Sequence, residues 1–349
     1  MSQPASRPRA FAPDLIRAVA IALVILLHLT GNARTTPDLD GVLGVTFHAI
    51  SRVSVPLFVM LSGWLLLTAP VRSAGDFWRR RLPRTLWPLL GASAFFIFWR
   101  AWLYGDSWTV VSALKGFIAA SIYYHLWYLY LILGLYLITP LLRTWYIHAD
   151  TANRRLALLF WIGLLVVPPI IHRLTGPEWF LTGEMWLDYG GFYVLGAWLG
   201  AREPDASACR WAALALIGGL FVTVVGTWLV TLPGHPQSTL FHDYVRPNIA
   251  LMSIGAFVLL QRLGRTAPPP TVAAPVRWIA RYSLWIYLAH PVVLELCGTG
   301  RAGPWLQSLM QGGALSLLGA TLFTLAVCAA AGSLVSRAGA LLAPGSSPS

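Results

Sequence analysis

Two ionisable side chains, Arg17 and His28, lie inside the first long apolar stretch of the chain, DLIRAVAIALVILLH. They are eleven positions apart, which on an α-helix is three full turns plus about 20°, so both lie on one stripe roughly 16 Å apart along the axis. Ionisable groups in a lipid-spanning helix are costly and usually face a bundle interior or a watery cavity. Histidine is also the commonest general base near neutral pH. The pair therefore predicts a chemical site in which His28 could accept a proton.

Each residue has a plainer interpretation when it is taken alone. Arg17 could extend to the cytoplasmic surface, held by Asp14 three residues earlier. His28 could hydrogen-bond to a neighbouring helix. The shared stripe favours the functional interpretation, because one lined cavity would hold both side chains.

A run of arginines, RRRLPR at 79–84, forms a second candidate. Such a run can anchor a cytoplasmic loop on anionic lipid head groups. It can also form an anion site, because guanidinium groups bind phosphates in a forked geometry. A phosphate-bearing donor such as coenzyme A would suit the second interpretation.

Further polar residues fall at membrane depth. His125 in YYHLWYLY and His290 in SLWIYLAHPVV each lie beside aromatic residues, and for both a structural and a functional role stay open. Pro291, directly after His290, is expected to break the helix locally and to free backbone groups toward a cavity. The full set comprises Arg52, Ser62, His125, Asp188, His290 and Glu295.

Composition defines the class of protein that positions these residues. The chain has 349 residues, of which 57% are hydrophobic and 11% charged, and its mean hydropathy is +0.65. Soluble domains have about 25% charged residues. We therefore predict an all-α, polytopic membrane helix bundle. With a window of roughly 20 residues, about ten spans are expected, at 14–33, 42–68, 86–104, 123–142, 156–172, 186–201, 211–231, 247–261, 282–297 and 313–335.

The net charge of +12 comes almost wholly from arginine, since Lys115 is the only lysine. If the N-terminus is cytoplasmic, most arginines fall in the inside segments, as the positive-inside rule requires. Both termini are then cytoplasmic, with tails at 1–13 and 337–349 around a membrane domain at 14–336. Topology explains the basicity, so a nucleic-acid partner is not expected. The three cysteines show neither paired nor metal-like spacing.

The motifs together resemble the acyltransferase-3 family of integral membrane acyltransferases. Asp14-Leu-Ile-Arg17, then ten residues and His28, resembles the opening helix of that family. Four later segments agree in order, and the resemblance spans about 14–291. One departure is Val55-Pro56 before Leu57-Phe58, where many members have Val-Asp-Phe-Phe. The four segments are SVPLFVMLSGWLL (54–66), RRLPRTLWP (80–88), HLWYLYLILGLYLITPLL (125–142) and SLWIYLAHP (283–291).

The resemblance implies transfer of an acyl group, usually acetyl from cytoplasmic acetyl-CoA as a substrate rather than a permanently bound cofactor. It places His28 and Arg17 at the reaction centre, with His28 as general base or, in an acyl-histidine mechanism, as nucleophile. The compact form is most similar to members that O-acetylate bacterial surface polysaccharides. The implied donor-binding residues are Arg80, Arg81 and Arg84, and the implied supporting residues are Asp14, Ser62, His125, Trp127 and His290.

The expected protein is thus a multi-pass O-acetyltransferase of the bacterial inner membrane. Membrane lipids surround it, and a glycan or lipid-linked saccharide is the acceptor. Two other classes stay open. A transporter or flippase of a lipid-linked saccharide could use Arg17, His28 and Glu295 to line its path. A sensory or scaffolding membrane protein would need neither Arg17 nor His28.

Overall fold

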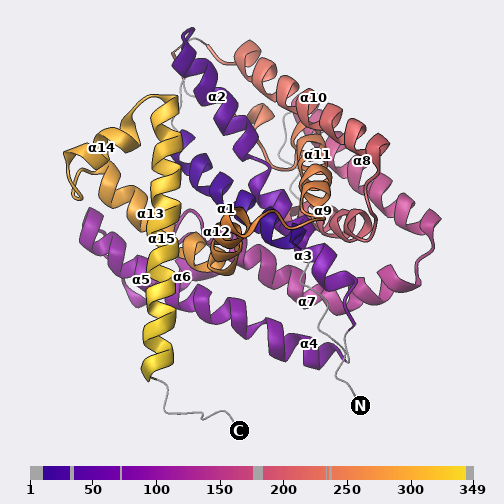
Figure 1. Cartoon of the computed structure of the whole chain (residues 1–349), viewed down its shortest axis with the longest axis horizontal. Coiled ribbons are helices and arrows are strands. Elements are labelled where there is room, and N and C mark those ends of the chain that lie inside the picture. Colours follow the sequence, from indigo (N-terminus) through magenta and orange to yellow (C-terminus); the bar gives the residue numbers. More distant parts are fainter. Residues whose placement is uncertain are drawn as a thin grey trace. The chain divides into compact units, whose positions relative to one another are not determined.

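The computed structural model describes residues 11–31, 35–70, 73–175, 184–232, 234–235 and 238–342. Over these residues the chain forms fifteen α-helices and one 3₁₀ helix, with no strand (Figure 1). This confirms the predicted all-α class. The chain divides into two compact units: residues 1–58 with 202–349, here called the terminal unit, and residues 59–201, here called the central unit.

The terminal unit is built around α1 (Ala12–Thr30), which packs against helices from both ends of the chain. Pro13 lies in the first turn of α1, where a missing N–H costs nothing, and Asp14 complements the positive end of the helix dipole. The other elements of this unit are α2 (Leu39–Ser51), α10 (Ala206–Val230), η1 (Thr239–Phe241), α11 (Pro247–Leu263), α12 (Pro270–Arg281), α13 (Ser283–Gly298), α14 (Pro304–Gln311) and α15 (Ala314–Leu342).

The central unit contains most of α3 and the six helices that follow it. Their bounds are α3 (Ser54–Leu67), α4 (Ala74–Arg81), α5 (Pro83–Tyr104), α6 (Val110–Ile118), α7 (Trp127–His148), α8 (Thr151–Thr175) and α9 (Glu184–Gly200). Glycines let α9 approach α3 closely, because their four-residue spacing places two of them on one helix face. A Cβ on Gly196 would lie 2.0 Å from the Met60 carbonyl oxygen, and one on Gly200 would lie 2.1 Å from the Trp64 ring.

The predicted second span, 42–68, is not one uninterrupted helix. A turn at Arg52 and Val53 separates α2 from α3, and the amides of these two residues bond to carbonyls only three residues back. Pro56 supplies the physical reason, because it has no N–H to offer the Arg52 carbonyl. The prediction of a single helix was wrong at this point.

Each predicted span falls largely on helical residues, and six helical stretches of the described chain are long and apolar enough to cross a membrane. α11 and α13 are apolar but shorter. The protein is therefore a membrane protein with several spans, while the count of ten stays a prediction. The six stretches are Ala12–Thr30, Leu39–Leu67, Ala74–Tyr104, Trp127–His148, Ala206–Val230 and Ala314–Ala338.

Candidate active site

Arg17 and His28 lie on one continuous helix, α1, so the predicted stripe exists. Asp14 is buried, and its carboxylate accepts a hydrogen bond from the Arg17 guanidinium at 3.4 Å. The expected local partner of Arg17 is therefore present. About a quarter of the Arg17 side chain is exposed.

His28 meets a second histidine from a distant part of the chain. The rings of His28 and His290 stack with centroids 5.2 Å apart and planes 24° apart. His290 lies on α13 and is fully buried, whereas His28 is partly exposed. The structure thus brings together two of the residues that the sequence singled out, more than 260 positions apart.

Pro291 explains how the His290 ring is oriented. Because Pro291 has no N–H, the carbonyl of Tyr287 four residues earlier loses its helical donor. Nδ1 of His290 lies 2.7 Å from that carbonyl oxygen. A carbonyl can only accept, so Nδ1 carries the hydrogen and Nε2 carries the lone pair. The expected helix break was wrong, since α13 continues through Pro291, but a backbone group is freed and the histidine occupies it.

A second histidine pair lies beside α1. His48 of α2 is buried, and its ring meets that of His242 edge to face at 4.7 Å. Nε2 of His48 lies 2.9 Å from the Arg52 guanidinium, which can only donate, so Nε2 is the acceptor. Nδ1 then donates to the Thr30 hydroxyl at 3.1 Å, and that hydroxyl donates onward to the Leu26 carbonyl. Both ring nitrogens of His48 are committed, so this histidine orients other groups rather than transferring protons.

Arg52 is the fixed positive charge of this cluster. Its guanidinium lies 5.0 Å from the centre of the Tyr244 ring, and its Nε is buried without a hydrogen-bond partner in the described chain. No carboxylate within the described ranges pairs with it. Its charge acts on His28, His48 and His242 alike. Such a cation, held in place by His48, is suited to stabilise negative charge that develops on a substrate.

The loop between η1 and α11 contributes two titratable groups outside the membrane-spanning helices. Burial and the nearby charge of Arg52 lower the pKa of His242 to about 4, so this imidazole is neutral at physiological pH. Burial raises the pKa of Tyr244 above its ordinary value, so its hydroxyl stays protonated. Nε2 of His242 is buried and, within the residues described, has no hydrogen-bond partner.

Three predicted supporting residues lie in the central unit. His125 is buried among aromatic rings, with its centroid 5.0 Å from that of Phe96 and 5.6 Å from that of Tyr123. Trp127 begins α7 and lies 5.8 Å from the Tyr189 ring. Ser62 lies partly buried on α3. The surroundings of His125 are those of a packed core, and its part in the site stays a prediction.

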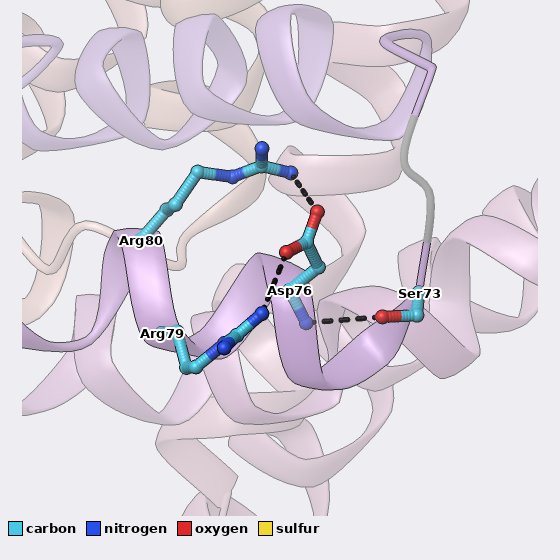
Figure 2. A network of polar contacts seen from close by, with 4 residues as sticks. All are labelled: Ser73, Asp76, Arg79 and Arg80. Atoms are coloured by element: carbon cyan, nitrogen blue, oxygen red, sulfur yellow. Dashed lines mark hydrogen bonds and ion pairs between the residues drawn. The ribbon is translucent and has the colours of Figure 1, made fainter.

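The arginine run spans the last turn of α4 and the first residues of α5 rather than a loop. Arg79 and Arg80 both reach back to the carboxylate of Asp76, at 3.0 and 2.9 Å, and the Asp76 amide is capped by the Ser73 hydroxyl (Figure 2). Arg81 is partly buried and Arg84, on α5, is exposed. Neither has a carboxylate partner in the described residues. The donor site expected here is thus partly neutralised on its own helix.

Sequence reasoning missed His48, His242, Tyr244 and Thr30, and noted Arg52 without giving it a role. The four-residue spacing of His48 and Arg52, which places both on one helix face, was a usable signal. His242 and Tyr244 fall in an aperiodic segment, where no pattern indicated their contact with α2.

The family follows from this arrangement together with comparison to known proteins. An acyltransferase domain model matches residues 11–332, nearly the whole chain, so the protein belongs to the acyltransferase-3 family. A protein named amino-acid racemase from Enterococcus faecalis is 25% identical over 305 residues. That match covers 82% of this chain and 41% of the relative, so the chain spans about two fifths of the relative's length. No solved structure matches it significantly.

Proposed function

We propose that the protein is a multi-pass acyltransferase of the bacterial inner membrane that moves an acetyl group from cytoplasmic acetyl-CoA to a hydroxyl of a cell-surface or lipid-linked glycan. The observation that carries this proposal is the stacked pair of His28 and His290 beside the fixed charge of Arg52. Both termini are cytoplasmic in this proposal, because the positive-inside rule places most arginines there. Membrane lipids surround the helices, and no nucleic acid takes part.

The chemistry assigns one role to each of these groups. His28 takes the proton of the acceptor hydroxyl as its oxygen attacks the thioester carbonyl. The carbonyl oxygen becomes an oxyanion, which Arg52 stabilises as a fixed cation. The carbon–sulfur bond then breaks, and the imidazolium of His28 returns its proton to the departing thiolate. His290 positions the His28 ring, and Arg17 holds the donor near the cytoplasmic end of α1.

An acyl-histidine route is the second form of the same proposal. His28 would then attack the thioester itself, and the acceptor hydroxyl would take the acetyl group from its ring. Arg81 and Arg84, with Arg80 to a lesser extent because of Asp76, would bind phosphates of the donor. The two routes differ in whether acetyl stays on the protein when no acceptor is present.

The name of the relative raises a different chemistry, racemisation of an amino acid. Lysine-based imine chemistry requires a desolvated lysine. Lys115, the only lysine of the chain, is exposed on α6. The matched share of the relative is also less than half. Acyl transfer is therefore the function that this chain's own residues support best.

Mass spectrometry of the cell's glycans, with and without the gene, tests the proposal. We expect one glycan to lose an acetyl-sized mass when the gene is deleted and to regain it with the wild-type gene. His28→Ala should fail to restore the mass. His148→Ala, which removes an exposed histidine at the end of α7, should restore it and is the matched control. A glycan that is mislocated but unchanged in mass would instead favour a transporter.

A further inference from the structure

A basic cavity lies in the terminal unit, away from the histidine pairs. Its volume is about 510 Å³, and side chains of α12, of Tyr282 directly after it and of α15 line it. Small-molecule sites in proteins have volumes of roughly 300–1,000 Å³. The lining residues are Arg277, Trp278, Arg281, Tyr282, Ser333, Ser336 and Arg337.

Three guanidinium groups converge on this cavity without acidic partners. Arg277 and Arg281 are four residues apart on α12 and therefore share one helix face, and Arg337 comes from α15. None of the three pairs with a carboxylate in the part of the chain that the structure describes. Arginines that only anchored a loop on the membrane surface would not need to line one common cavity. The convergence indicates an anionic ligand.

The aromatic and hydroxyl side chains that line the cavity indicate which further groups the ligand has. Trp278 is 37% exposed and Tyr282 is partly buried, so both offer ring surface to a planar group. Ser336 adds a hydroxyl donor on α15, while the hydroxyl of Ser333, one turn away, already donates to the Ala330 carbonyl oxygen. Guanidinium and hydroxyl groups bind phosphate oxygens, and aromatic rings stack on planar bases. This combination fits a nucleotide.

The cavity is linked to the N-terminal end of α1, the end that carries Arg17. Arg277 lies 5.8 Å from the centre of the Phe11 ring, which immediately precedes α1, and α1 packs along α12. His28 is seventeen residues further, about 26 Å along the helix axis. A ligand that serves both places must be long, with phosphates at one end and the reacting group on a thin arm. Coenzyme A thioesters have this form.

We propose that the cavity binds the phosphate-bearing nucleotide end of the acyl donor, through Arg277, Arg281 and Arg337. The proposal rests on the proposed function, in which the donor is a coenzyme A thioester. Anionic phospholipid head groups carry the same phosphate chemistry, so the experiment must separate the two sources.

Isothermal titration of the purified full-length protein provides the test, with coenzyme A and adenosine 3′,5′-bisphosphate as probes in phosphatidylcholine nanodiscs. Arg281→Gln, and separately Arg337→Gln, should raise the Kd for both probes about tenfold or more, as expected for a lost charge-assisted hydrogen bond. Arg262→Gln, which removes an exposed arginine near the end of α11, should change the Kd less than about twofold.

Two results would overturn the proposal. One is a Kd for coenzyme A that stays within about twofold of wild type in both cavity variants. The other is that the cavity variants alter the binding of phosphatidylglycerol in the nanodisc and leave the binding of coenzyme A unchanged. If the wild type binds adenosine 3′,5′-bisphosphate through these arginines but transfers no acyl group, the nucleotide site stands and the proposed function fails.

Discussion

Two arginine-rich regions of this protein look alike in composition and differ in available charge. On α4, Arg79 and Arg80 are both bound to Asp76 of the same helix (Figure 2). In the terminal unit, Arg277 and Arg281 face a cavity with no carboxylate partner in the described chain. The most conspicuous run of positive charge is thus partly used within its own helix, whereas the arginines at the cavity keep their full charge available.

The difference teaches that the number of charges in a segment does not measure its capacity to bind an anion. A guanidinium that already pairs with a carboxylate must lose that interaction before it binds a phosphate. Arg52 extends the comparison, because it lacks a carboxylate partner in the described residues and is held by the neutral ring of His48. Uncompensated arginines therefore mark both the nucleotide end and the reacting end of the proposed site.

The largest effect is expected at the reacting end. His28→Ala should lower kcat by about 10²- to 10⁴-fold, because that is the usual contribution of a general base. The affinity for coenzyme A should stay unchanged, since no phosphate contact is lost. Acetyl transfer in isolated membranes, with separate titration of coenzyme A, measures both quantities. If the His28→Ala variant bound coenzyme A poorly and kept a normal kcat, His28 would belong to the nucleotide end of the site, and the distinction between the two ends would fail.

A pH effect should follow from the burial of His242 and, to a lesser extent, from the nearby charge of Arg52. The pKa of His242 is about 4 in the folded protein and about 6.5 in the unfolded chain. The unfolded state therefore binds the proton first, so stability is present above pH 6.5 and is lost as the pH falls toward 4. Linkage gives a loss of about 2 kcal/mol between pH 7 and pH 5 from this one group.

Thermal unfolding in detergent at the two pH values measures this loss. His242→Gln removes the titrating group, so its unfolding temperature should depend less steeply on pH. An equally steep dependence in that variant would mean that His242 is accessible to protons in the folded state, and that Arg52 is not as isolated as the comparison requires.

Substitutions in the two arginine regions should change the KM for acetyl-CoA by different amounts. Arg281→Gln should raise KM about tenfold, through the loss of an available phosphate ligand. Arg80→Gln should raise it less than about twofold, because Asp76 already holds that guanidinium and exposed ion pairs contribute little. Steady-state kinetics of the two variants in the same membranes makes the measurement. Equal increases in KM would remove the distinction between the regions.

The smallest effect is expected from releasing the paired arginines. Asp76→Asn leaves Arg79 and Arg80 without their carboxylate, while Ser73 can still cap the helix. If α4 takes part in donor binding, the KM for acetyl-CoA should fall by about two- to threefold, which corresponds to less than 1 kcal/mol. An unchanged KM would assign α4 to the membrane surface alone and would sharpen the contrast with the cavity.

The sequence predicted the helix of Arg17 and His28, because an eleven-residue spacing fixes their common stripe on any α-helix. The ion pairs of Asp76 could have been found, since they are local contacts along α4. The stacking of His28 on His290, the contact of His48 with His242, and the cavity between α12 and α15 could not, because each depends on how distant helices pack.

The most direct test of the central claim measures thiol release and acetyl transfer together in the purified protein. With labelled acetyl-CoA and the isolated glycan, we expect one free coenzyme A thiol for each acetyl group that appears on the glycan. His28→Ala should reduce both products to the same extent. Glycan movement across a vesicle membrane without thiol release, or equal release by His28→Ala, would contradict the assignment of His28 as the catalytic group of an acyltransferase.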